Sequence, residues 1–119
     1  MKTFKVFILE DEYLITRSLQ IILESMGHQV QSTSSGEEAL NLWGKFKPDL
    51  AFIDILLPGM NGLDFLKKRP QHFLTKIVLI SAHDNLNEKE LLSLGACLFV
   101  KKPFKNIFQL VKSSLQLLS

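Results

Sequence analysis

The 119-residue sequence has room for one hydrophobic core, so we expect a single domain over residues 1–119. Its net charge of +2 is too small to predict a nucleic-acid-binding surface, and the basic residues are scattered along the chain. A single cysteine, Cys97, excludes an internal disulfide. The sequence shows neither a signal peptide nor an apolar run long enough to cross a membrane. These features predict a soluble cytoplasmic protein.

Short apolar runs alternate five times with longer amphipathic stretches. The runs typical of buried strands are 6–9, 50–53, 77–80 and 97–100, and 29–33 is a weaker, alternating strand. Stretches with helical spacing of apolar residues follow them, over about 13–26, from 34–38 to before Pro48, over 63–68, from Asn85 to near Gly95, and over 107–118. This alternation predicts an α/β fold. We expect a flavodoxin-like, doubly wound, five-stranded parallel sheet with strand order 2-1-3-4-5 and helices on both faces.

Helix starts and isolated residues give further expectations. The segment 34–38 holds two overlapping capping boxes, each a serine three residues before a glutamate, and Asn85 stands in the same relation to Glu88. Cys97 is expected to be a small packing residue. The histidines lack the spacing of a metal site and are expected to be exposed: His28, His72 and His83.

Polar side chains follow four adjacent strands of the predicted sheet. They are Glu10, Asp11 and Glu12 after the first strand, Asp54 after the third, Ser81 after the fourth, and Lys101 and Lys102 after the fifth. Ligands of such sheets bind beyond the carboxyl ends of the strands. Clustered carboxylates repel each other, and Mg²⁺ is a natural compensating ion. An ionised Asp54 beside Mg²⁺, the Lys102 ammonium and the Ser81 hydroxyl is suited to accept a phosphoryl group.

Each of these residues also has an ordinary structural interpretation. Asp11 could cap the first helix, and Asp54 could be a turn residue. Ser81 could be a loop hydroxyl and Lys102 a solvated side chain. Their joint placement on adjacent strand ends favours a functional site.

Four segments of the sequence resemble the receiver domain of bacterial two-component response regulators, in particular the chemotaxis-regulator type. The segments are the acidic run 8–12, the segment 52–62 around Asp54, the hydroxyl-alanine step 80–82, and 95–104 with Lys102, Pro103 and Phe104. They occur in the order and with the spacing of the family. The resemblance covers the whole chain.

The resemblance implies phosphorelay signal transduction. A sensor histidine kinase or phosphotransfer protein would phosphorylate Asp54. Asp11 would bind Mg²⁺ directly and Glu10 through a water, and Asp54 and the Leu56 carbonyl would complete the protein ligands. Leu56 and His83 stand at positions that tune the lifetime of the phosphate in the family. An apolar Leu56 is expected to hinder attack by water, whereas His83 could assist hydrolysis or contact a kinase.

The same resemblance assigns a switch and an output. Ser81 would bind a phosphoryl oxygen, Lys102 would pair with Asp54 and then with the phosphate, and Phe99 would turn inward on activation. The bond between Lys102 and Pro103 is expected to be cis. The signal would leave through the fourth helix, fifth strand and fifth helix toward a downstream effector or output domain. A phosphorylation-dependent homodimer is a further possibility, and the domain itself would be a signalling module rather than an enzyme.

Three other functions share parts of this pattern. A flavodoxin-like electron carrier needs a phosphate-binding loop after the first strand, and the acidic residues there would repel a phosphate. A phosphoaspartyl hydrolase of the haloacid dehalogenase type needs a second aspartate where Leu56 stands. A degenerate receiver that works without phosphorylation would lack some of the side chains that are present here.

Overall fold

The computed structural model describes residues 2–70, 74–82 and 87–119. Its strands are β1 (Lys5–Leu9), β2 (Gln29–Thr33), β3 (Leu50–Asp54), β4 (Lys76–Ser81) and β5 (Ala96–Lys101). Its helices are α1 (Tyr13–Ser25), α2 (Gly36–Phe46), α3 (Gly62–Lys68), α4 (Glu88–Ser93) and α5 (Ile107–Leu115), and a 3₁₀ turn over Gln116–Leu118 follows. The five strands are parallel and lie in the order β2-β1-β3-β4-β5. The predicted fold class and strand order are confirmed.

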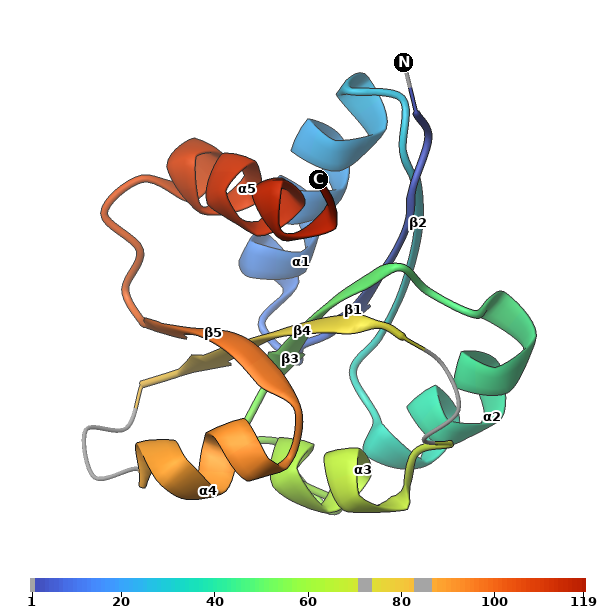
Figure 1. Ribbon diagram of the computed structural model, residues 1–119, viewed down its shortest axis with the longest axis vertical. Helices are drawn as coiled ribbons and strands as arrows, with labels where there is room; N and C mark the ends of the chain where they lie inside the picture. Colours follow the sequence, from blue (N-terminus) through green and yellow to red (C-terminus); the bar gives the residue numbers. More distant parts are fainter. Residues whose placement is uncertain (1, 71–73, 83–86) are drawn as a thin grey trace.

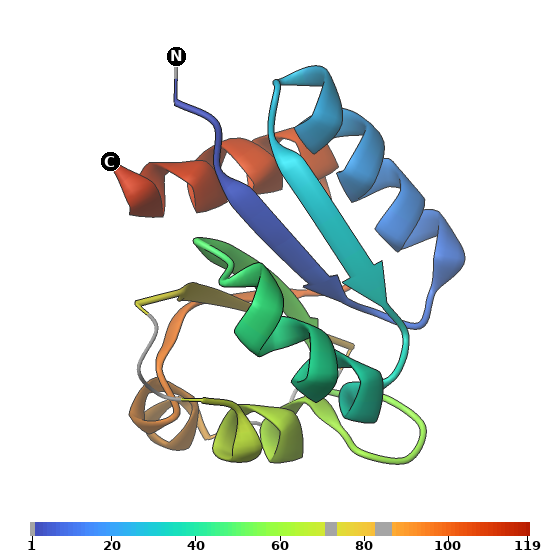
Figure 2. The ribbon, with the colours of Figure 1, turned by 90° about the vertical axis from the view of Figure 1, so that its right-hand side faces the viewer.

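The sheet is the middle of three layers. Helices α1 and α5 cover one face, and α2, α3 and α4 cover the other (Figures 1 and 2). Successive residues of a strand point to opposite faces, so the continuous apolar runs supply both cores. In β1, Val6 and Ile8 pack toward α1 and α5, whereas Phe7 and Leu9 pack toward α2 and α3. This two-sided burial is why β1, β3 and β4 read as unbroken apolar runs in the sequence, whereas the edge strand β2 is mostly polar and exposed.

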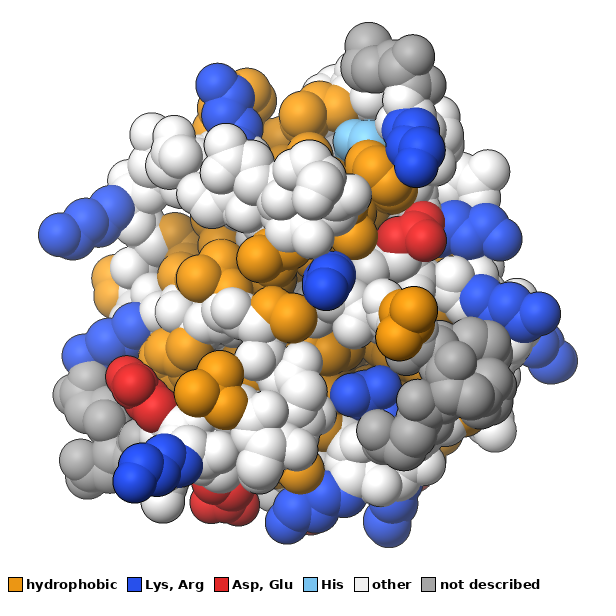
Figure 3. Space-filling view, viewed as in Figure 1, with side chains coloured by type: hydrophobic (Ala, Val, Ile, Leu, Met, Phe, Trp, Pro, Cys, Tyr) orange, Lys and Arg blue, Asp and Glu red, His pale blue; other side chains and the backbone are white. Residues whose placement is uncertain are grey.

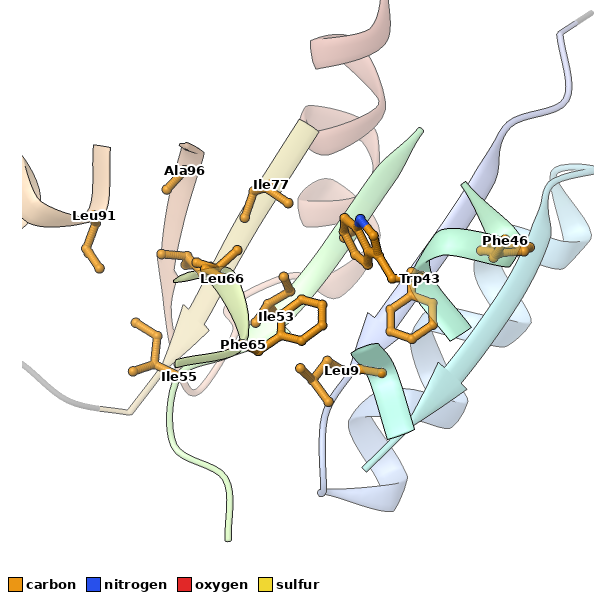
Figure 4. Packing of buried hydrophobic residues seen from close by; sticks show 14 residues of the cluster. Leu9, Trp43, Phe46, Ile53, Ile55, Phe65, Leu66, Ile77, Leu91 and Ala96 are labelled. Carbon is orange, nitrogen blue, oxygen red and sulfur yellow. The ribbon is translucent and has the colours of Figure 1, made fainter. Parts of the chain in front are cut away.

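The core on the α2–α3 side is built around Trp43. Its ring meets Phe7 at 5.7 Å and Phe65 at 5.3 Å between centroids, both edge to face, which is a favoured aromatic geometry. Figure 4 shows this cluster between β1, β3 and the helices of that face. The packing ties the start of α3, which follows the loop after β3, to the sheet.

Several helix starts and buried residues differ from the sequence predictions. The second of the two serines in 34–38 caps α2, because the Ser35 side chain accepts a hydrogen bond from the Glu38 backbone N–H at 3.2 Å. The cap of α4 is Asn87, so the prediction of Asn85, which lies outside the described residues, is wrong. His28 is buried, since Phe4 stacks on its ring at 5.5 Å, and Cys97 is exposed. His72 and His83 lie outside the described residues.

The amino ends of the strands are joined by hydrogen bonds outside the sheet ladders. The Lys5 N–H donates to the Asp49 carboxylate at 2.8 Å, and the Lys76 N–H donates to the Asp49 carbonyl at 2.9 Å. The Phe4 N–H donates to the Nδ1 atom of His28 at 3.0 Å. Residues flanking β1, β2, β3 and β4 are therefore fastened together at the end opposite the polar strand ends. Within the described residues, no helix combines the length and the apolar character needed to span a bilayer.

Candidate functional site

The carboxyl edge of the sheet brings the predicted site residues together. Asp54 is the last residue of β3, and Ser81 is the last residue of β4, while Glu10 and Lys102 immediately follow β1 and β5. Strands β1, β3, β4 and β5 are consecutive neighbours in the sheet. The β4–β5 ladder has one register shift, between Ile77 and Val78, and then pairs Ser81 with Lys101 at the carboxyl end. The parallel topology thus places an acid, an aspartate, a hydroxyl and an amine on one rim.

Three carboxylates converge at this rim. One oxygen from each of Glu10, Asp11 and Asp54 lies within 4.8 Å of the others. Glu10 and Asp54 are buried, with exposed fractions of 3 % and 2 %, whereas Asp11 is exposed to solvent. Asp11 does not cap α1, because the cap position belongs to Glu12. An all-oxygen donor set with one solvent-facing member suits a Mg²⁺ ion that keeps several waters.

The electrostatics of the buried acids support the same fit. Burial raises the pKa of Glu10 to about 8, and the hydrogen bond and negative charge of the neighbouring Asp54 add to the rise. Hydrogen bonds from Lys102 and from the Glu12 backbone N–H act in the opposite direction. The ionised form of Glu10 is therefore disfavoured beside Asp54, and a divalent cation would favour it.

The Lys102 ammonium lies inside the carboxylate cluster. Its Nζ atom is 2.8 Å from Glu10 Oε1, 2.8 Å from Asp54 Oδ2 and 3.2 Å from Glu12 Oε1. Burial disfavours the charged amine, but the hydrogen bonds and charges of Asp54 and Glu10 outweigh burial and raise the pKa of Lys102. Lys102 is therefore a fixed positive charge beside the Asp54 carboxylate.

The loop after β3 supports the other oxygen of Asp54. The Leu56 backbone N–H donates to Asp54 Oδ1 at 3.0 Å, so the two carboxylate oxygens have different partners. Gly62, at the start of α3, packs directly on this segment, and its N–H donates to the Ile55 carbonyl at 3.0 Å. A β-carbon on Gly62 would overlap the Asp54 carbonyl oxygen, so the close approach requires glycine.

The remaining predicted residues lie on β4, β5 and the turn after β5. Ser81 is fully buried, and its carbonyl accepts the Lys102 backbone N–H at 2.8 Å. Phe99 is half-buried and packs against the core on the α2–α4 side. The peptide bond between Lys102 and Pro103 is cis, as predicted.

Comparison with known proteins decides the family. The response regulator receiver domain profile matches residues 6–113. The chain belongs to this family. Receiver domains are signalling modules of two-component phosphorelay systems, and they generally bind Mg²⁺ at an acidic pocket such as the one formed by Glu10, Asp11 and Asp54.

The receiver domain is similar to regulators from several bacteria. It is 36 % identical over 103 residues to the transcriptional regulatory protein CrdR of Helicobacter pylori, a match covering 84 % of this chain and 48 % of CrdR. It is 38 % identical over 102 residues to the alkaline phosphatase synthesis regulator PhoP of Bacillus subtilis, covering 84 % of this chain and 42 % of PhoP. The match thus spans less than half the length of either relative. The chemotaxis protein CheY4 of Vibrio cholerae has a TM-score of 0.85 at 29 % identity, over 99 % of this chain and 100 % of that one.

One contact in the receiver site was not predicted from the sequence. Glu12 was recognised only as part of the acidic run, yet its side chain reaches Lys102, which lies 90 positions later in the chain. The sequence does contain a hint of this contact. Three acids follow β1, and the predicted metal site uses only two of them, Glu10 and Asp11. A lysine placed at the same sheet edge was its available partner.

Proposed function

We propose that Asp54 accepts a phosphoryl group, in a Mg²⁺-dependent reaction in the cytoplasm, from a phosphohistidine of a sensor histidine kinase or phosphotransfer protein. The observation that carries this proposal is the position of Asp54. Its carboxylate is buried at a strand end, with one oxygen held by the Leu56 N–H and the other by the Lys102 ammonium. A carboxylate held in one orientation, with an ammonium and two further acids beside it, is suited to act as the nucleophile in phosphoryl transfer.

The chemistry follows from these contacts. A carboxylate oxygen of Asp54 forms a bond to phosphorus while the phosphorus–nitrogen bond breaks, and its electron pair returns to the imidazole of the donor. The products are an acyl phosphate on Asp54 and an unphosphorylated histidine. Negative charge on the transferred oxygens would be met by Lys102, and Ser81 would donate a hydrogen bond to one of them.

We assign the metal ligands to the carboxylates of Glu10, Asp11 and Asp54 and to the Leu56 carbonyl, with Glu10 acting through a water. The three acids supply the hard oxygen donors that Mg²⁺ prefers. When bound, the ion neutralises charge on the phosphoryl group and on the acids around it. The Leu56 carbonyl is included because the resemblance to the family implies it.

The signal would leave the site through Ser81 and Phe99. We infer that Ser81 moves toward the phosphate and that Phe99 then turns inward, which changes the face formed by α4, β5 and α5. Phe99 is one of the residues that line a small pocket of about 190 Å³ between α4 and β5, so a change in its rotamer would reshape this face. We treat residues 1–119 as one receiver unit that controls an effector or output domain.

The face itself has features of a contact surface. A groove of about 690 Å³ lies between β5 and α5, and its lining includes the apolar Leu98, Val100 and Phe104 and the basic Lys101 and Lys105. Figure 3 shows hydrophobic side chains in the hollow between these two elements. This favours the α4–β5–α5 face as the site where the downstream partner, or a second phosphorylated copy, is recognised.

Incubation with Mg²⁺ and acetyl phosphate, followed by intact mass measurement, tests the proposal. Wild type and Asp64→Asn, which changes an exposed aspartate of α3, should gain one phosphoryl group. Asp54→Asn should gain none, and chelation of Mg²⁺ should suppress the gain in wild type. Absence of any gain in wild type would instead favour a receiver that works without phosphorylation.

A further inference from the structure

The Lys102 ammonium and a divalent ion would draw on the same two carboxylate groups, those of Glu10 and Asp54. Lys102 lies 2.8 Å from both Glu10 Oε1 and Asp54 Oδ2, and the side chains of these two acids belong to the predicted ligand group. An ion that draws on Glu10 and Asp54 therefore takes partners away from the ammonium. The side chain of Lys102 must then find another anion or turn into solvent.

Glu12 is the third partner of Lys102 and lies outside the ligand group. Its Oε1 atom is 3.2 Å from the Lys102 Nζ atom, and its side chain is 59 % exposed at the mouth of the site. The backbone N–H of Glu12 donates to Glu10 Oε2 at 3.0 Å, which fixes where the Glu12 side chain starts relative to the buried acids. Glu12 can thus hold the ammonium without drawing on a carboxylate of the ligand group.

We propose that Glu12 is a positioning residue that keeps the Lys102 ammonium at the mouth of the site when a divalent ion occupies Glu10 and Asp54. Among the described residues, Glu12 is one of three acidic partners of Lys102 in the ion-free site, and its loss leaves the two closer ones. In the ion-bound site Glu12 becomes the main partner. Glu12 therefore favours the ion-bound form, and it keeps the amine ready for the incoming phosphoryl group. This inference rests on the proposed function.

A double-mutant cycle measured by calorimetric titration with Mg²⁺, without any phosphodonor, tests the inference. Glu12→Gln should weaken Mg²⁺ binding by about two- to fivefold, the range expected for a partly exposed ion pair. The same substitution in a Lys102→Met background should change Mg²⁺ affinity no more than Glu38→Gln does in wild type. Glu38 is an exposed acid in the first turn of α2, so that control removes one negative charge without touching Lys102.

A second measurement follows the amine directly. With Mg²⁺ at saturation, the NMR signal of the Lys102 methylene next to Nζ should move toward the position of solvated lysine in Glu12→Gln and stay shifted in wild type. Equal effects of Glu12→Gln in both backgrounds, or an unchanged Lys102 signal, would refute the positioning role and leave the phosphoacceptor proposal intact. Failure of wild type to bind Mg²⁺ at all would overturn both.

Discussion

Substitution of Gly62 by alanine tests whether the approach of α3 to Asp54 shapes the site. Alanine at the first position of a helix would ordinarily stabilise the protein by about 0.4–1 kcal/mol relative to glycine. Here the added β-carbon would overlap the Asp54 carbonyl oxygen and lie 2.9 Å from the Ile55 Cα atom. Both neighbours are backbone atoms and cannot swing aside, so the cost falls in the upper part of the range for overpacking, about 1–3 kcal/mol. We expect a net loss of about 2 kcal/mol in the free energy of unfolding.

Urea denaturation followed by the fluorescence of Trp43 measures this loss. With an m-value of about 2 kcal/mol/M, the midpoint should fall by about 1 M. Gly44→Ala is the matched control, because nothing lies within 4 Å of its added β-carbon and the midpoint should rise. Gly62→Ala should also accept a phosphoryl group more slowly than Gly44→Ala, since the strained segment carries Asp54. A Gly62→Ala protein as stable and as reactive as wild type would refute the reasoning.

Three further predictions concern other parts of the chain. Leu56→Asn should speed loss of the phosphoryl group by up to about tenfold, a barrier change of about 1.4 kcal/mol. The reason is that a carboxamide can orient water, whereas the leucine side chain, which is 44 % exposed, excludes it. The rate is measured from the decay of the phosphorylated mass. Burial lowers the pKa of His28, whose Nδ1 accepts the Phe4 N–H. As the pH falls, the imidazole is therefore protonated in the unfolded chain before it is protonated in the folded one. The free energy of unfolding should therefore decrease below about pH 6.5, and less so in His28→Asn, as urea titrations across pH will report. Ser35→Ala should cost about 1 kcal/mol through loss of the α2 cap, and Ser34→Ala almost nothing, in the same denaturation assay.

Each of these expectations has an outcome that would contradict it. An unchanged decay rate in Leu56→Asn would show that the side chain at this position does not control access of water. Parallel pH profiles for wild type and His28→Asn would show that His28 does not contribute to the acid destabilisation. Equal decreases in the free energy of unfolding of Ser34→Ala and Ser35→Ala would show that Ser35 does not cap α2.

The sequence predicted the sheet and the rim residues for the same physical reason. Strands buried on both faces must be apolar throughout, so the first polar residue after each run marks where the strand leaves the core. That residue is Glu10 after β1 and Asp54 at the end of β3, and the parallel topology brings such residues to one edge. The site was therefore predictable once the strand order was assumed.

The sequence-based predictions were wrong or incomplete in two situations. In one, a contact joins segments that are distant in the chain; in the other, two similar residues could both cap the same helix. The burial of His28 depends on Phe4, which packs on its ring from the segment before β1, and no local pattern shows that contact. Asn87, and not Asn85, caps α4, because the cap depends on where the backbone first turns into the helix. The ion pair of Glu12 with Lys102 spans 90 positions and became visible only with the fold.

The hydrogen bonds of Asp49 have a consequence for how a receiver of this kind transmits a signal. They clamp the amino ends of β1, β3 and β4 far from the rim, with distances of 2.8 and 2.9 Å. We expect these strands to keep their positions relative to one another. A rearrangement would then be confined to the loops at the carboxyl ends of the strands. Protection of the Lys5 and Lys76 amide protons from exchange with solvent should accordingly be the same whichever state the rim is in.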